Sequence, residues 1–302
     1  MIATAPPETT PEDLRIRVHG DASLPTLVYL PGLHGDWTLV SSFRAAVAGR
    51  VRFAEFTYPR TTSWSLDDHA RWIEEALLAN GVTGGWLIGE SFGSQPAWQM
   101  IRRAQQRANG APPSPVARKP EIPTASAESA SNRKSPTAFQ PQGLILAGGF
   151  VRHPTIWAVR LAQRVSGAVS LRTVERWCRV YAGYAKFRHR HAPETLASIE
   201  EFVANRTVDA DRHAITYRYG LIAGNDLRAV ARATTIPVYY LAGLVDPLVP
   251  WCHARWWLRR NCPGYFGGRT IWRADHNVLA TAPQASAKLI LQWIRGPNGV
   301  TE

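Results

Sequence analysis

The stretch Trp86-Leu87-Ile88-Gly89-Glu90-Ser91-Phe92-Gly93 places a serine between two glycines directly after a short apolar run. A segment suited to a helix, residues 95–105, follows it. The order of strand, sharp turn and helix gives this G-x-S-x-G pattern a physical meaning, because the turn strains the serine backbone while the glycines let neighbouring chain segments pass close by. We therefore expect Ser91 to project its hydroxyl from the edge of a sheet into a cleft.

Strand and helix patterns alternate on both sides of this turn. The period-two run 14–19 predicts a half-exposed edge strand, and the continuous apolar run 26–30 predicts a strand buried on both faces. Ser65 is the expected N-cap of a helix over 65–80. Further strands are expected at 51–56, 143–147, 236–243 and 269–272, and further helices at 42–48 and 284–294. Such alternation predicts an α/β fold with a mostly parallel sheet covered by helices on both faces.

Two segments interrupt the alternation in a chain of 302 residues, of which 45% are hydrophobic, enough to bury a large core. Residues 108–141 are rich in Pro, Ser, Ala, Arg and Lys, and they predict a flexible insertion or, alternatively, a docking arm for a partner. Residues 151–225 lose the strand pattern and predict a helical cap or lid. The core would then comprise residues 1–150 and 226–302.

The formal charge of +12 raises nucleic acid or an anionic surface as a possible partner. The arginines are scattered, however, so we expect a solvated cationic surface and no nucleic-acid partner.

The chain has three cysteines, Cys178, Cys252 and Cys262, which lack metal-ligand spacing and suit a reducing compartment. A disulfide between the last two would need a turn at 261–263. Without a secretory signal or a membrane-length apolar run, the sequence predicts a cytoplasmic protein, and it gives no indication of oligomeric state.

A serine nucleophile needs a base that takes its proton and a third group that orients the base. His276 follows the expected strand 269–272, and Asp246 follows the expected strand 236–243 in a turn fixed by two prolines. Asp275 is the alternative orienting residue, but the side chains of adjacent residues usually point apart. The other histidines, including those of the run 188–191, are expected to be solvated lid residues rather than bases.

In chain order these residues are Ser91, Asp246 and His276, and with this order the chain resembles the α/β-hydrolase superfamily. The resemblance rests on the motif 30–35 (Leu-Pro-Gly-Leu-His-Gly), the motif 89–93 and the two later loops, and it covers nearly the whole chain apart from the insertion. It implies an α/β-hydrolase fold with an inserted helical lid.

The resemblance also implies an oxyanion hole formed by the backbone N–H of Phe92 and one N–H of the 30–35 loop. This loop departs from the common pattern, since Pro31-Gly32 stands where many members have His-Gly, and a second pair, His34-Gly35, follows. Matched to the end of the expected strand, the second donor is Leu33 N–H. A shifted register would make it Asp36.

The function that the resemblance implies is hydrolysis of a small carboxylic ester through an acyl-enzyme, without metal or organic cofactor. Ser91 would be the nucleophile, His276 the base and Asp246 the residue that orients it. A thioesterase or acyltransferase, a C–C bond hydrolase and a cofactor-free perhydrolase would use the same triad, and a catalytically silent binding member of the fold is the non-enzyme alternative.

No substrate-binding residue is assigned from the sequence. Glu90 would either orient the local backbone or touch the substrate. Aromatic residues of the predicted lid would either line an apolar pocket or pack in a core, and these are Trp157, Trp177, Tyr181, Tyr184 and Phe187.

Overall fold

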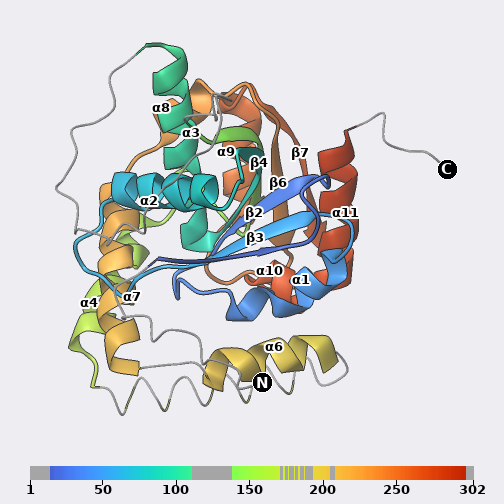
Figure 1. Cartoon of the computed structure of the whole chain (residues 1–302). Coiled ribbons are helices and arrows are strands. Elements are labelled where there is room, and N and C mark those ends of the chain that lie inside the picture. The colour runs from blue at the N-terminus through green and yellow to red at the C-terminus, as the bar shows by residue number, and fades with distance from the viewer. Residues whose placement is uncertain are drawn as a thin grey trace, which may run out of the picture.

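The computed structural model describes residues 14–110, 138–170, 193–204 and 208–296, together with single positions between 171 and 192. Its centre is a seven-stranded sheet in the order β1-β3-β2-β4-β5-β6-β7 (Figure 1). β1 runs antiparallel to β3, and the remaining neighbours are parallel. The strands are β1 (Arg15–His19), β2 (Thr26–Leu30), β3 (Arg52–Thr57), β4 (Gly84–Glu90), β5 (Gln140–Ala147), β6 (Val238–Gly243) and β7 (Tyr265–Ile271).

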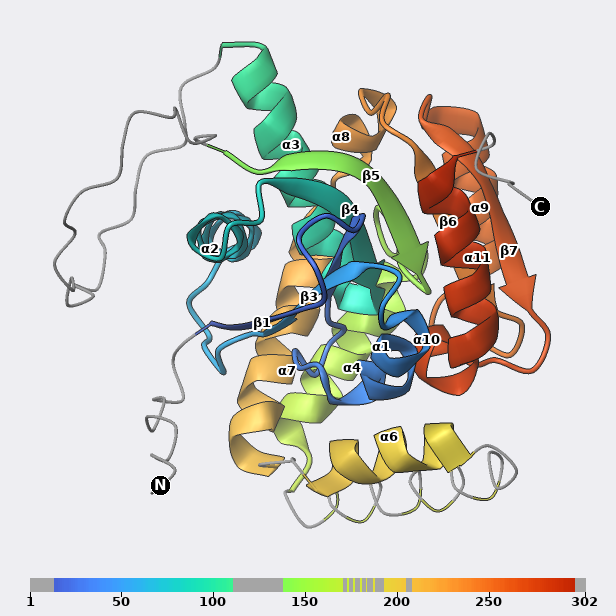
Figure 2. The same cartoon turned by 45° about the vertical axis from the view of Figure 1, so that its right-hand side comes forward.

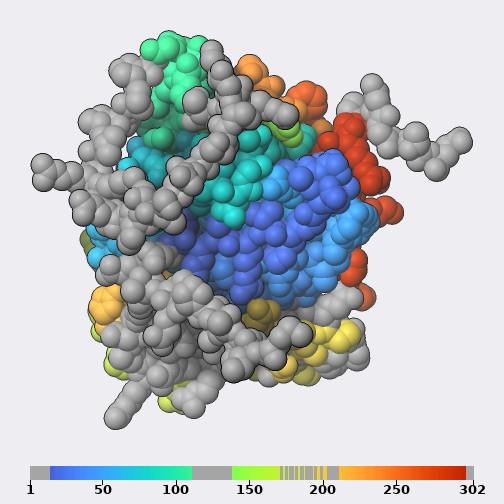
Figure 3. Space-filling view, in the orientation of Figure 1, coloured from blue at the N-terminus to red at the C-terminus, as the bar shows by residue number. Residues whose placement is uncertain are grey.

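The burial of each strand follows its place in the sheet. β2 and β4 lie at the centre and are buried along almost their whole length, as a strand covered on both faces must be. β1 lies at the edge, and its residues alternate between exposed and half-buried. In the space-filling view the first described residues of the chain, in dark blue, lie at the surface of the molecule (Figure 3).

Helices cover both faces of the sheet (Figures 1 and 2). Apolar side chains of α1 (Ser41–Val47), α10 (Val278–Thr281) and α11 (Pro283–Arg295) form the core of one face. Those of α2 (Leu66–Ala79), α3 (Ser94–Ala108), α8 (Arg228–Arg232) and α9 (Trp251–Asn261) form the core of the other. The α/β fold class that the alternating pattern predicts is confirmed.

The predicted cap region contains α4 (Ile156–Ala168), α6 (Pro193–Ala204) and α7 (Val208–Gly224). α4 packs along α7, whereas α6 lies against α1 and the short helix η1 (Thr38–Val40). Arg218 of α7 donates hydrogen bonds to the carbonyls of Leu33 and Pro59, in the loops that follow β2 and β3. The helical block therefore lies at the carboxyl ends of the parallel strands. That residues 151–225 form a separate cap domain remains a prediction.

Most of the predicted insertion, residues 111–137, lies outside the described part of the chain. β5 starts at Gln140, three residues before the expected start, and the side chain of Phe139 is fully buried in the core. The strand is therefore anchored by an aromatic residue that stands directly before it.

Other boundaries also differ from those expected. Ser65 caps α2 as predicted, in a reciprocal pair of hydrogen bonds with Asp68. β7 starts at Tyr265 rather than near residue 269, and α9 was not predicted.

Cys252 and Cys262 are free thiols near the two ends of α9, about 15 Å apart at the helical rise, so they cannot form a disulfide bond. Cys178 lies outside the described residues. Among the described helices, none has both the length and the hydropathy that crossing a bilayer requires.

Candidate active site

The turn after β4 holds Ser91 in a strained conformation. Ser91 has a φ of 50°, and it is the one non-glycine residue with positive φ in the described part of the chain. The flanking glycines make room for this turn: a Cβ on Gly89 would lie 2.6 Å from Ser94 Cα, and one on Gly93 would lie 2.0 Å from the carbonyl oxygen of Leu30. No larger residue fits at either glycine without moving the backbone, which explains the G-x-S-x-G spacing.

The structure brings Ser91, His276 and Asp246 into one chain of hydrogen bonds. His276 Nε2 lies 2.8 Å from Ser91 Oγ, and His276 Nδ1 lies 2.9 Å from Asp246 Oδ2. An ionised carboxylate only accepts hydrogen bonds, so Nδ1 carries the imidazole proton and Nε2 is left as the acceptor for the serine hydroxyl. This is the tautomer that a general base for Ser91 requires.

Asp246 is held by its own loop. Its side chain is fully buried, and Oδ1 accepts hydrogen bonds from the backbone N–H groups of Leu248 (2.8 Å) and Val249 (3.0 Å). Oδ2 is thereby left to face His276. The alternative orienting residue, Asp275, accepts a hydrogen bond from Asn277 N–H at 3.0 Å instead.

Negative groups around His276 set its proton affinity. Burial would lower the pKa of His276, but the hydrogen bond and charge of Asp246, with the charges of Glu90 and Asp275, outweigh it and hold the pKa above its ordinary value. The imidazole is therefore both correctly oriented and more basic than a free histidine.

Two polar residues at the start of α3, which the sequence did not indicate, hold the turn that carries Ser91 in place. Ser94 and Gln95 are fully buried. Ser94 Oγ lies 2.6 Å from the Ser91 carbonyl oxygen and accepts a hydrogen bond from Phe150 N–H at 3.1 Å. Gln95 Nε2 donates to the carbonyls of Phe150 and Val151. These bonds tie the start of α3 to the segment after β5.

The loop after β2 lies against Ser91. A Cβ on Gly32 would be 3.5 Å from Ser91 Cβ, which places the following residue, Leu33, beside the serine. Asp36 lies further along, where its carboxylate accepts a hydrogen bond from Thr38 N–H at the start of η1. Phe92, the other expected donor residue, has a fully buried side chain. That Leu33 N–H, rather than Asp36 N–H, is the partner of Phe92 remains a prediction.

Glu90 points away from solvent. It is 3% exposed and shares the face of β4 with Ile88 and Trp86, beneath α1 and α11. Tyr29 Oη donates to Glu90 Oε2 at 2.5 Å, while Oε1 is buried without a hydrogen-bond partner. Burial raises the pKa of Glu90, although the Tyr29 hydrogen bond and the His276 charge act against it. Of the two roles expected from the sequence, support of the local structure fits this burial, and substrate contact does not.

The expectation that the other histidines are solvated is wrong for two of them. His69 is 1% exposed within an aromatic cluster with Tyr58 and Phe92, and burial lowers its pKa to about 4. His153 is 9% exposed; burial lowers its pKa, and its Nδ1 accepts a hydrogen bond from Thr155 N–H. His69 Nδ1 donates a hydrogen bond to the Ser65 carbonyl at 2.8 Å, so each of the two rings is held by a backbone partner. The run 188–191 lies outside the described residues.

The predicted lid aromatics are described in part. Trp157 and Phe187 are 72% and 68% exposed, so neither packs in a core. Trp177, Tyr181 and Tyr184 lie outside the described residues.

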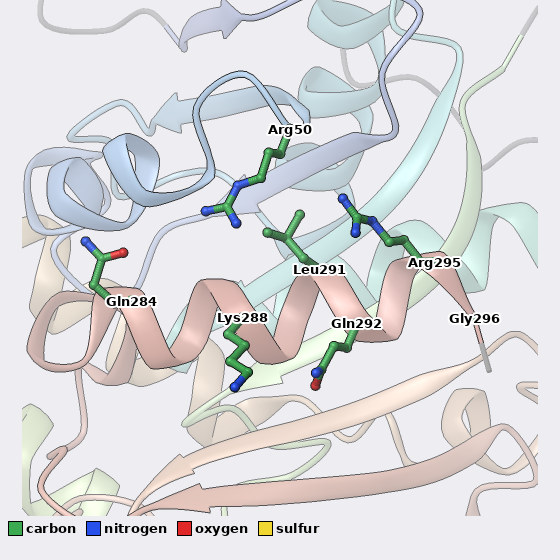
Figure 4. A pocket seen from close by; sticks show the side chains of 7 residues that line it. All are labelled: Arg50, Gln284, Lys288, Leu291, Gln292, Arg295 and Gly296. Carbon is green, nitrogen blue, oxygen red and sulfur yellow. The ribbon is translucent and has the colours of Figure 1, made fainter. Parts of the chain in front are cut away.

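A hollow of about 410 Å³ lies between α11 and the turn after α1 (Figure 4). Arg50, Lys288 and Arg295 contribute to its lining, and no triad residue does. Lys288 points to the opposite side of α11 from Arg50, so the cationic groups do not converge on one point (Figure 4). Within the described ranges, no three His, Cys, Asp or Glu side chains gather as metal ligands would.

No model of a known protein family matches the sequence, and a comparison with curated proteins finds no match. Solved structures, in contrast, match over nearly the whole chain. A hydrolase from Pseudomonas aeruginosa is 16% identical with a TM-score of 0.67, and the match covers 94% of each chain. A thermophilic esterase from Thermogutta terrifontis is 18% identical with a TM-score of 0.62 and 93% coverage of each chain.

An enol-lactonase from Burkholderia xenovorans is 15% identical with a TM-score of 0.62, and the match covers 92% of this chain and 95% of that one. At these identities the likeness establishes the fold. The chain thus has the α/β-hydrolase fold that the three sequence motifs predict.

Proposed function

We propose that this chain, with its α/β-hydrolase fold, is a serine hydrolase that cleaves carboxylic esters through an acyl-enzyme. One observation carries the proposal: the hydrogen bonds from Asp246 through His276 to Ser91, which end on a serine held at positive φ. Outliers of backbone geometry concentrate at active sites, where the surrounding structure must hold them in place. A silent binding protein would have no use for a base with its acceptor nitrogen aimed at that serine.

The reaction would proceed in two steps. Ser91 Oγ attacks the ester carbonyl carbon as its proton passes to His276 Nε2, and the tetrahedral intermediate then expels the alcohol, which takes that proton. Water attacks the acyl-enzyme, His276 removes its proton, and the carboxylic acid leaves as Ser91 is reprotonated. Asp246 stays ionised and stabilises the imidazolium that forms in each step.

The backbone N–H groups of Phe92 and Leu33 would stabilise the oxyanion. Gly32 lies against Ser91, so the segment that carries Leu33 N–H is next to the reacting carbonyl. A donor of this kind contributes about 3 kcal/mol to transition-state binding.

The substrate would enter beneath the helical block of α4, α6 and α7, which lies at the carboxyl ends of the strands and would act as the cap. Esterases and an enol-lactonase among the solved structures of this fold support an ester or lactone as the substrate class. Thioesters, acyl transfer and C–C bond hydrolysis use the same triad and are the alternatives within this reaction type.

A fluorophosphonate probe tests the nucleophile. Wild-type protein should be labelled, Ser91→Ala should not, and Ser23→Ala, which removes an exposed surface hydroxyl, should be labelled normally. Equal labelling of wild type and Ser91→Ala, or no labelling of either, would contradict the proposal.

A panel of p-nitrophenyl esters of rising acyl length, run beside acyl-CoA substrates, then tests the substrate class. Ester turnover that disappears in Ser91→Ala supports an esterase. Turnover of acyl-CoA without any ester turnover would replace the esterase assignment with a thioesterase.

A further inference from the structure

Arg218 of α7 is a long cationic side chain that is only 2% exposed. Its Nη1 donates to the Leu33 carbonyl at 2.8 Å and its Nη2 to the Pro59 carbonyl at 3.0 Å. Burial of a guanidinium is costly unless fixed polar partners replace its water. These two carbonyls belong to the loops after β2 and β3, so one side chain of the helical block fastens both loops.

The same side chain lies tightly against the loop that follows β2. A Cβ on Gly35 would be 2.4 Å from Arg218 Nη1, so only a glycine leaves room for the guanidinium there. Gly35 N–H donates to the Gly32 carbonyl at 2.9 Å, which closes a turn around Leu33. The N–H and C=O of a trans peptide point in opposite directions, so this bond directs Leu33 N–H out of the turn.

Arg218 fixes the next peptide of that turn by holding the Leu33 carbonyl. Its guanidinium carbon also lies 6.0 Å from the ring centroid of Phe92 and 5.6 Å from that of Tyr58. The cation therefore contacts both segments that would supply the oxyanion donors, one through a carbonyl and the other through a ring.

We propose that Arg218 is a positioning residue for the oxyanion hole: from α7 it sets the orientation of Leu33 N–H, and its buried positive charge favours the developing oxyanion. The inference rests on the proposed serine hydrolase function. It gives the helical block a part in catalysis as well as in covering the site, because α7 carries the side chain that shapes the hole.

The test compares Arg218→Met, Arg218→Lys and the control Arg212→Met. Arg212 lies on the same helix and also donates to a backbone carbonyl, that of Val169 at 3.0 Å, but away from the oxyanion loop. Each protein is measured for kcat and KM on a p-nitrophenyl ester, for inhibition by a trifluoromethyl ketone that forms a tetrahedral adduct with Ser91, and for thermal unfolding.

Arg218→Met should lower kcat about 100-fold with KM changed less than threefold, a loss comparable to that of one oxyanion donor. Binding of the trifluoromethyl ketone should weaken by a similar factor, because transition-state analogues report interactions made only in the transition state. Arg218→Lys keeps the charge and should recover about tenfold of the lost kcat. Arg212→Met should retain the wild-type kcat even where its unfolding temperature falls.

Wild-type kcat in Arg218→Met, or a loss of kcat in Arg212→Met as large as that in Arg218→Met, would overturn the inference. If Arg218→Met does not fold, Arg218→Lys decides alone: a kcat at least fivefold below wild type at unchanged KM supports the role, and a wild-type kcat refutes it. Failure of the proposed function is distinct, since wild-type protein would then show neither ester turnover nor labelling of Ser91, and the role of Arg218 would fall with it.

Discussion

Replacement of Asp246 by Asn should leave the fold intact and trap His276 in the wrong tautomer. In the native loop, Oδ1 accepts two backbone N–H groups while Oδ2 faces the imidazole. In Asp246→Asn, the amide oxygen must stay with the two N–H donors, because the opposite orientation would place an NH₂ group against both. The amide NH₂ then donates to Nδ1, the proton moves to Nε2, and Ser91 loses its base.

The expected loss is about 10⁴-fold in kcat, the size of the loss when a Ser-His-Asp triad is left with the wrong histidine tautomer. It corresponds to about 5.4 kcal/mol of transition-state stabilisation. Ester turnover under saturating substrate measures it, and the circular dichroism spectrum checks the fold. Asp275→Asn is the matched control, since the Asp275 carboxylate adjoins His276 in sequence but accepts a hydrogen bond from Asn277 N–H. This variant should keep kcat within about threefold of wild type. If Asp246→Asn kept more than a tenth of the wild-type kcat, or if Asp275→Asn lost more, the assignment of the orienting carboxylate would be wrong.

Further predictions concern pH and the turn around Ser91. Because the base must be neutral to act and the pKa of His276 is raised, kcat/KM should be low at acid pH and rise with a midpoint above about 6.5. Glu90→Gln removes one of the charges that raise this pKa and should move the midpoint to lower pH. An unchanged midpoint would mean that the Glu90 charge does not affect the imidazole. Gly93→Ala should lower the free energy of unfolding in urea by more than about 3 kcal/mol, since its Cβ would meet a main-chain oxygen of β2. The control Gly224→Ala has open space around the new methyl group and should be neutral or stabilising. Ser91→Gly and Ser91→Ala should both be inactive, but the glycine variant should be more stable by about 1 kcal/mol because it adopts positive φ without strain. Equal or greater stability of Ser91→Ala would argue against strain at this turn.

The elements that the sequence predicted well are those whose signals are local. The run 26–30 matches β2 residue for residue, because a strand buried on both faces is apolar throughout. Ser65 caps α2 through bonds to a residue three positions away. Ser91, Asp246 and His276 were each expected directly after a strand, and the structure places the three side chains within hydrogen-bonding distance, since parallel strands present their carboxyl ends at one edge of the sheet. Their catalytic roles remain a proposal.

The features that the sequence missed depend on contacts between distant segments. Gly267 and Gly268 interrupt the apolar pattern of β7, so its first half was not expected. α9 buries only Ala254 and Leu258 on its apolar side and therefore has no clear helical periodicity. Arg218 looks like any other arginine of a cationic surface, and only the packing of α7 against two loops reveals its burial.

The separation of the triad along the chain has a consequence for folding kinetics. Ser91 and its base are 185 residues apart in sequence, whereas Asp246 and His276 are 30 apart. Closing so long a loop carries an entropic cost that favours late formation of the contact, after the shorter loops have closed. On the proposed function, fluorophosphonate reactivity of Ser91 should therefore appear only once β6 and β7 have docked beside β5, which would make this labelling a reporter of a late stage of refolding.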